Sequence, residues 1–138
     1  MKVRWLVTYD ADGQMDIKDM DLFIKHIKQD EKLGLDLEDK KPDIYLGSRF
    51  VHGAKVDNIP ALRKIILSIA RVVTKFFYGT NTSDPHNGYR VISLNALRKF
   101  TLTADGMHYA NELNEQIRGN KMKYTEIPVH IRYTSYSL

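Results

Sequence analysis

Hydrophobic and polar positions alternate along the chain in blocks that predict strands and helices in turn. Residues 3–9 (VRWLVTY) are short, β-branched and aromatic, which is typical of a buried strand, and they end abruptly at Asp10. Apolar residues then recur at helical spacing over residues 20–27, and Asp16 or Asp19 is the expected N-cap of that helix. The chain therefore starts with a strand, a polar loop and a helix.

The middle of the chain predicts a second strand and a long helix. A charged, turn-prone stretch (LDLEDKKP) follows Gly34, which is expected to stop the first helix, and residues 43–48 (DIYLGS) then have the composition of a strand. From Pro60, apolar residues recur at steps of three and four until Gly79. Residues 60–78 are thus the clearest helix in the sequence.

The last part of the chain continues the alternation, with a strand at 89–94, helices at 95–100 and 107–118, and a final strand at 123–133. Pro128 favours an edge position or a strand start. Alternating strands and helices predict a single α/β layered domain whose functional loops lie beyond the carboxyl ends of its strands. Three polar clusters are predicted at such ends: residues 10–16, 47–49 and 83–90.

The amino-acid composition excludes several classes of catalytic and binding site. The 138 residues, 43% hydrophobic and 28% charged, suit one globular domain, and the absence of cysteine excludes a thiolate nucleophile, a disulfide framework and a cysteine zinc site. A net charge of +4 is compatible with phosphorylated ligands, nucleic acid or an anionic membrane and does not choose among them. The lysines and arginines are scattered, without an aromatic-interleaved basic stripe, so no nucleic-acid partner is expected.

The DADG segment is the first candidate site. Asp10 and Asp12 flank one alanine directly after a strand, so a tight turn can aim both carboxylates, with Gln14 beyond them, at a hard divalent cation. An EF-hand is excluded by spacing, because Gly13 is fourth and Asp21 twelfth in the motif. A solvated acidic turn that caps the next helix and another kind of calcium turn both remain alternatives.

The other two clusters offer phosphate-binding chemistry. In GSRF, two small residues let a phosphate approach the backbone, and Arg49 provides a planar fork for phosphate oxygens. In SDPHNGYR, Asp84 is fixed by the following proline, Gly88 permits a sharp turn, and Arg90 returns the chain to a strand. Each cluster taken alone is equally compatible with an ordinary surface turn.

Taken in order, four segments resemble family-two glycosyltransferases of the dolichol-phosphate mannosyltransferase and polyprenyl-phosphate glycosyltransferase type: VTYDADGQMD, IYLGSRF, SDPHNGYRVIS and KYTEIPVHIRYTSYS. The resemblance covers nearly the whole chain and implies a partial GT-A fold, a mixed sheet flanked by helices, with Mg²⁺ or Mn²⁺ as cofactor. It implies Asp10, Asp12 and Gln14 as metal ligands, Gly47, Ser48, Arg49, Gly88 and Arg90 as donor or acceptor phosphate-binding residues, and Asp84 as the catalytic residue near the acceptor. Glu126 and Tyr133 match structural positions.

The function implied by the resemblance is inverting transfer of a sugar from a nucleotide-sugar donor to a polyprenyl-phosphate or glycan acceptor. A lipid phosphate is already an anionic nucleophile, whereas a sugar hydroxyl needs a general base such as Asp84. The segment ADGMHYANELNEQ lacks the adjacent Glu-Asp pair that many hydroxyl-directed relatives use as their base. This absence favours a phosphate acceptor, or a base at Asp84.

The extent of the chain is a further expectation. In the family the strands that bind the nucleotide base precede the DxD strand, which here begins at residue 3, and relatives continue beyond residue 138. Residues 1–138 are therefore expected to form one domain, the acceptor-side half of a GT-A domain that lacks those nucleotide-binding strands. The alternative is an inactive truncated remnant that folds and oligomerises without transferase activity.

The helix at residues 60–78 suggests a partner. Its apolar stripe runs beside Arg63, Lys64, Arg71 and Lys75, so the helix could make peripheral contact with an anionic membrane, which is compatible with a cytoplasmic location at the inner membrane face. A core helix with a solvated basic edge and a homodimer interface are the alternatives. The five histidines show no metal-ligand spacing, and His86 alone, within the Asp84 loop, is a candidate for substrate contact.

Overall fold

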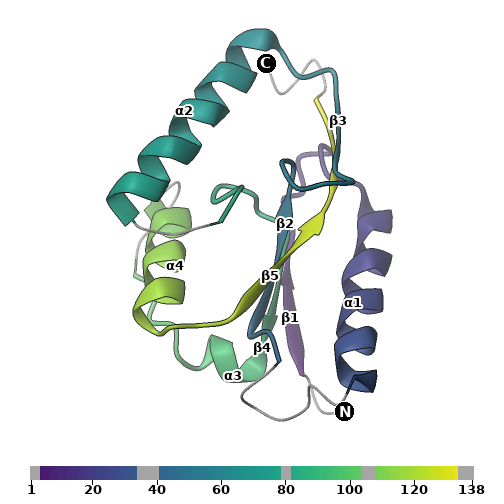
Figure 1. Ribbon diagram of the computed structural model, residues 1–138, viewed down its shortest axis with the longest axis vertical. Helices are drawn as coiled ribbons and strands as arrows, with labels where there is room; N and C mark the ends of the chain where they lie inside the picture. The colour runs from purple at the N-terminus through teal and green to yellow at the C-terminus, as the bar shows by residue number, and fades with distance from the viewer. Residues whose placement is uncertain (1–3, 34–40, 79–81, 104–107, 134–138) are drawn as a thin grey trace.

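The computed structural model describes residues 4–33, 41–78, 82–103 and 108–133 (Figure 1). Gly34 and Gly79, at which two helices were expected to end, lie outside these residues. Most of the turn expected at residues 35–42 lies outside them as well. Most of the predicted strands and helices lie within them and can be compared directly.

A four-stranded mixed sheet forms the centre of the molecule (Figure 1). Its order is β1 (Trp5–Thr8), β4 (Arg90–Ser93), β2 (Ile44–Ser48) and β5 (Tyr124–Pro128). β4 runs antiparallel to both of its neighbours, while β2 and β5 are parallel. The predicted α/β class, with a mixed sheet flanked by helices, is confirmed, and the arrangement is that of a partial GT-A domain.

Helices cover both faces of this sheet because successive strand residues point to opposite sides. Tyr45 and Val91 face α1 (Met20–Lys32), whose Phe23 is fully buried. Ile44 and Ile92 face the other side, where they pack with α3 (Leu94–Leu97) and α4 (His108–Gly119). In Figure 1, α1 and α4 accordingly lie on opposite sides of the strands.

A 3₁₀ turn, η1 (Ile17–Asp19), precedes α1. Of the two predicted caps, Asp16 caps this turn by accepting a hydrogen bond from the Lys18 N–H at 3.0 Å. Asp19 stands at the N-cap of α1 but makes no capping bond, because its carboxylate accepts the backbone N–H of His130. Both carboxylates thus fasten the loop that follows β1.

The final predicted strand is divided in two, and a short strand was missed. Residues 123–133 form β5, which ends at Pro128, and β6 (His130–Arg132), which pairs in parallel with the unpredicted β3 (Lys55–Asp57) in a second sheet. Pro128 lacks an N–H for the ladder, so the edge strand β5 ends there, as the proline rule anticipates. Val129, between the two strands, is 1% exposed.

The long predicted helix is confirmed as α2 (Ala61–Tyr78). It lies beyond one end of the sheet, next to α4 (Figure 1). Three partly buried positions at helical spacing, Arg63, Leu67 and Ala70, mark the side of α2 that faces the rest of the molecule. The other described side chains of α2 are exposed.

Candidate active site

The three predicted polar clusters meet at one edge of the central sheet. Thr8 of β1 and Leu46 of β2 both pair with Arg90, the first residue of β4. Clusters 10–16 and 47–49 occupy the carboxyl ends of their strands, as predicted. Cluster 83–90 precedes β4 and so lies at an amino end, contrary to the prediction, but the antiparallel direction of β4 brings it to the same edge.

The loop after β1 forms a tight turn with two exposed carboxylates, Asp10 and Asp12. Gly13 has a φ of +78°, in the left-handed region that favours glycine. The N–H of Gln14 donates to Oδ1 of Asp12 at 3.0 Å, and the carbonyl of Gln14 accepts the N–H of Arg132 at 2.8 Å. Strand β6 therefore holds the loop in place from the side.

Asp10 lies directly against the loop that precedes β4. A Cβ added to Gly88 would fall on the Asp10 carboxylate, so only glycine leaves room for this contact. Thr8 secures the same junction, because its hydroxyl donates to the Gly88 carbonyl at 2.7 Å. The predicted metal-binding and phosphate-binding loops are thus in direct contact.

Arg49 and Asp84 form a buried, bidentate ion pair. Nε of Arg49 donates to Oδ2 of Asp84 at 2.7 Å and Nη2 donates to Oδ1 at 2.6 Å, with side chains 10% and 2% exposed. Asp84 also accepts the backbone N–H of Arg49 and the side-chain amide of Asn87. Burial disfavours the charged guanidinium, but the hydrogen bond and charge of Asp84 outweigh it and raise the pKa of Arg49.

A second set of polar contacts holds the same loop from the β5 side. Glu126 accepts both the backbone N–H of Ser83 at 2.6 Å and its hydroxyl at 2.8 Å, and that hydroxyl lies 2.6 Å from the hydroxyl of Ser48. Ser48 is fully buried and also accepts the N–H of Phe50. In this conformation Ser48 and Glu126 therefore position the Ser83 end of the loop.

Gly47 is buried within β2, where its backbone lies close to a neighbouring segment. Its N–H donates to the carbonyl of Tyr89 at 2.7 Å, and a Cβ added to it would lie 2.9 Å from that oxygen. Because glycine has no side chain, position 47 leaves room for the backbone at Tyr89, which leads into β4.

Arg90 is buried beneath the 83–88 loop, with 2% of its surface exposed. Its Nη2 donates to the carbonyl of Pro85 at 3.2 Å, and Nη1 makes a long 3.5 Å bond to the hydroxyl of Tyr109. Burial lowers the pKa of Arg90, while Tyr109 and the charges of Asp10 and Asp84 oppose that change. Arg90 is therefore held by neutral oxygens, with two carboxylates nearby.

His86 lies among these charged groups. Its pKa is lowered, first by burial and further by the charges of Arg90 and Arg49, whereas Asp84 raises it. The lowered pKa favours the neutral form of the imidazole. Because one side chain senses both arginines and Asp84, the second and third clusters share one electrostatic environment.

The fit of a metal ion depends on the loop after β1. Carboxylate and amide oxygens of Asp10, Asp12 and Gln14 are the hard donors that Mg²⁺ and Mn²⁺ prefer. Across the described ranges, no group of three or more His, Cys, Asp or Glu side chains could hold a metal ion by itself. By donor chemistry alone these three side chains match a hard cation, and a site built on them would need further oxygens from a bound ligand.

Several contacts of the site were not identified from the sequence. Tyr133, expected only at a structural position, accepts a bond from Nη1 of Arg49 at 2.8 Å, and Asn114 of α4, which was not predicted, donates to the Pro85 carbonyl at 3.0 Å. Asn114 is 1% exposed, and its place on the buried side of α4 was an available signal, because a buried amide needs a partner. Tyr109 and Asn87 gave no comparable signal.

Comparison with known proteins places the chain among curated relatives of about twice its length. It is 28% identical over 134 residues to the polyprenol monophosphomannose synthase of Mycolicibacterium smegmatis, covering 96% of this chain and 46% of that protein. It is also 28% identical to the UDP-N-acetylglucosamine–dolichyl-phosphate N-acetylglucosaminyltransferase of Methanococcus voltae, covering 96% and 49%. An uncharacterized protein of Methanocaldococcus jannaschii is 26% identical over 139 residues, covering 99% and 53%.

No family model matches the chain. It spans about half the length of the curated relatives that it matches, and nearly all of its own length is aligned in each of those three comparisons. The comparisons confirm the resemblance of this chain to family-two glycosyltransferases of the polyprenyl-phosphate type that its four sequence motifs indicate.

Proposed function

We propose that this chain is the acceptor-side half of a metal-dependent, inverting glycosyltransferase that moves a sugar from a nucleotide-sugar to a polyprenyl phosphate. The observation that carries the proposal is the contact between loops at one sheet edge. Asp10 lies against Gly88, and Arg49 pairs with Asp84 of the same loop. The names of two relatives support this acceptor class, because they refer to polyprenol and dolichyl phosphate.

Asp10, Asp12 and Gln14 would hold Mg²⁺ or Mn²⁺ against the donor diphosphate. When bound, the cation supplies positive charge that stabilises the nucleoside diphosphate as it leaves. The exposed carboxylates of Asp10 and Asp12 remain accessible for this role. Arg90, buried beside Asp10 and Asp84, adds a fixed positive charge beneath the loop.

A phosphate acceptor fits the chemistry of Asp84 better than a sugar hydroxyl does. A general base needs an oxygen free to take a proton, but both Asp84 oxygens accept bonds from Arg49. A lipid phosphate needs no base, only cations that orient it for attack opposite the leaving group. In this proposal Asp84 acts by holding Arg49, and proton abstraction by Asp84 would require the ion pair to open.

Isothermal titration of the chain with UDP and GDP, each with and without Mn²⁺, tests the proposal. We expect Mn²⁺-dependent nucleotide binding that Asp12→Asn abolishes, because a neutral amide is a poorer ligand for a hard cation. Asp21→Asn is the matched control, since Asp21 is an exposed carboxylate in the first turn of α1, beyond the loop. No binding at millimolar nucleotide would instead favour a remnant that folds without transferase activity.

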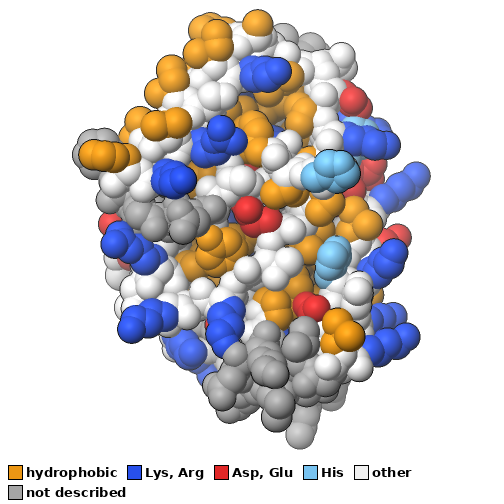
Figure 2. Space-filling view, in the orientation of Figure 1, with side chains coloured by type: hydrophobic (Ala, Val, Ile, Leu, Met, Phe, Trp, Pro, Cys, Tyr) orange, Lys and Arg blue, Asp and Glu red, His pale blue; other side chains and the backbone are white. Residues whose placement is uncertain are grey.

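We also propose that α2 rests on an anionic membrane surface. Its large apolar side chains are 44% to 83% exposed and follow one stripe of the helix: Leu62, Ile65, Ile66, Ile69, Val72, Val73 and Phe76. Figure 2 shows apolar side chains along the edge of the molecule formed by α2, with basic side chains beside them. Lys64, Arg71 and Lys75 form that basic edge, which suits anionic lipid head groups.

No helix within the described residues is long and apolar enough to cross a bilayer. Cosedimentation with phosphatidylglycerol vesicles, compared with phosphatidylcholine vesicles, measures the surface contact directly. We expect binding to the anionic vesicles and much weaker binding to the neutral ones. A dimer in analytical ultracentrifugation, together with no vesicle binding, would mean that a second copy of the chain covers the stripe.

A further inference from the structure

The orientation of Arg49 depends on more than its ion pair. Asp84 engages Nε and Nη2, and the hydroxyl of Tyr133 accepts a bond from Nη1 at 2.8 Å. A guanidinium has five N–H donors in a fixed plane. Within the described part of the chain these bonds use three donors, leaving one on each Nη atom. Tyr133 and Asp84 together therefore fix the direction of the two remaining N–H groups of Arg49.

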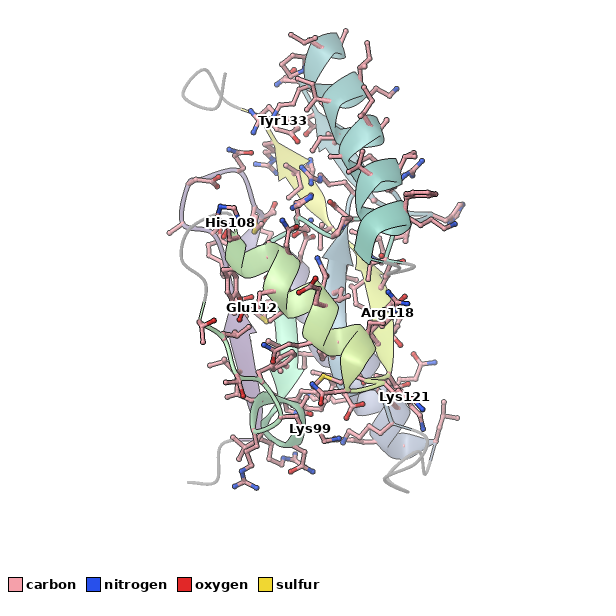
Figure 3. All side chains as sticks on the ribbon, turned by 90° about the vertical axis from the view of Figure 1, so that its left-hand side faces the viewer. Lys99, His108, Glu112, Arg118, Lys121 and Tyr133 are labelled. Atoms are coloured by element: carbon pink, nitrogen blue, oxygen red, sulfur yellow. The ribbon has the colours of Figure 1, made fainter. Side chains whose placement is uncertain are left out.

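Tyr133 is itself firmly held. It is 4% exposed, and its backbone N–H donates to the carbonyl of Asp57 at 3.1 Å, which extends the β3–β6 pairing by one residue. The guanidinium of Arg63, on α2, lies 4.7 Å from the centre of the Tyr133 ring. Figure 3 shows Tyr133 just past the end of β6, beside α2.

A second aromatic residue repeats this arrangement. The Phe50 ring lies 5.7 Å from the Arg49 guanidinium and 5.4 Å from that of Arg71, also on α2. The two α2 arginines are eight residues apart and each stacks on a ring that contacts Arg49. Tyr133 and Phe50 therefore contact both α2 and Arg49, so the position of the helix and the position of the Arg49 guanidinium depend on the same two side chains.

We propose that Tyr133 is a positioning residue for the acceptor-phosphate site, orienting the Arg49 guanidinium so that its two remaining N–H groups meet a phosphate. The assignment rests on the proposed function of Arg49. Tyr133 acts through Arg49, and Arg63 keeps the Tyr133 ring in place. Loss of the hydroxyl leaves Nη1 without this acceptor in a largely buried place, so the guanidinium turns more freely.

Tyr133→Phe tests the proposal because it removes a single oxygen. NMR of the Arg49 guanidinium measures rotation of its Nη groups, and titration with farnesyl phosphate, a single-phosphate probe, measures binding. We expect faster Nη rotation at Arg49 and affinity lower by roughly threefold to tenfold, the range of one ordinary hydrogen bond, because the lost bond acts on the phosphate only through Arg49. The melting temperature is recorded for each variant, so that partial unfolding is recognised.

Tyr109→Phe is the matched control, since its hydroxyl contacts Arg90 instead of Arg49. It should leave the Arg49 rotation rate unchanged. An unchanged rate in Tyr133→Phe, or the same increase in both variants, would overturn the proposal. If the wild-type chain does not bind farnesyl phosphate but Tyr133→Phe still frees Arg49, the proposed function fails while the hold of Tyr133 on Arg49 stands.

Discussion

Helices α2 and α4 are both amphipathic in sequence, yet the structure uses their apolar sides in opposite ways. α4 buries Leu113 and Ile117 against the sheet, in one cluster with Ile44 and Ile92. α2 leaves seven large apolar side chains exposed, and none of its described side chains is buried. Helical periodicity therefore identifies the apolar side of a helix but does not say what covers it.

Different attachments explain the contrast. α4 leads into the central sheet through a tight turn at Lys121, which has a φ of +51°, and the N–H of Met122 donates to the carbonyl of Ile117 at 2.9 Å. The described ring contacts of α2 are instead made by charged side chains, Arg63 and Arg71. α4 is thus part of the core, whereas α2 contacts the rest of the molecule through a mixed side, with Arg63, Leu67 and Ala70 partly buried, and presents its large apolar stripe outward.

The largest expected difference between the two helices is in stability. Leu113→Ala should lower the free energy of unfolding by about 2–5 kcal/mol, because it leaves a cavity in a fully buried site. Ile69→Ala in α2 should change it by less than about 0.5 kcal/mol, since Ile69 is 57% exposed. Urea denaturation at one protein concentration measures both values.

A comparable loss of unfolding free energy in Leu113→Ala and Ile69→Ala would contradict the conclusion that α4 is buried and the α2 stripe is exposed. It would mean that the α2 stripe is buried in solution, against a second copy of the chain. Repeating the denaturation at a tenfold lower protein concentration then separates the cases, because only an oligomer loses stability on dilution.

The basic side chains of α2 provide a second comparison, in which the expected effect is smaller than the loss of stability in Leu113→Ala. The double variant Lys64→Gln with Lys75→Gln should weaken binding to phosphatidylglycerol vesicles about 30-fold, at about 1 kcal/mol for each basic side chain near an anionic surface. Lys25→Gln with Lys28→Gln on α1 is the matched control, because it removes equal charge from exposed positions of the helix across the sheet. An equal loss in the control would mean that net charge, and not the α2 surface, governs the binding.

The fold could be predicted from the sequence where each segment carries its own pattern. The strands β1 and β2 and the helix α2 have clear composition and periodicity, and they occur where expected. β2 is buried throughout, but the prediction that the first strand is buried was wrong, because β1 lies at the edge of the sheet with Leu6 41% and Val7 40% exposed. β3 was missed because it has three residues, of which Lys55 and Asp57 are exposed. The break at Val129 was missed because this apolar residue continues the alternation of the strand before it.

The site could be predicted as residue types but not as pairs. The sequence separates Arg49 from Asp84 by 35 positions and from Tyr133 by 84, so no local pattern reports that they touch. The sequence and its family resemblance indicated Arg49 as a phosphate ligand and Asp84 as a catalytic residue. Neither indicated that the two side chains form an ion pair with each other. The antiparallel direction of β4, which brings the 83–88 loop to the site, is likewise a product of strand pairing.

The smallest expected effect concerns how α2 is held. Arg71→Met keeps the aliphatic stem but removes the charge that stacks on Phe50, so it should cost about 0.5–1 kcal/mol, the usual worth of an exposed cation–π contact. Hydrogen exchange should then show faster opening of α2 while α4 keeps its protection, since α4 is held by burial. Lys75→Met removes a charge from the same helix with no described ring contact, and it should leave both helices unchanged. Equal loosening of α2 and α4 in Arg71→Met would mean that the two helices open as one unit, and the contrast between them would then be one of surface chemistry alone.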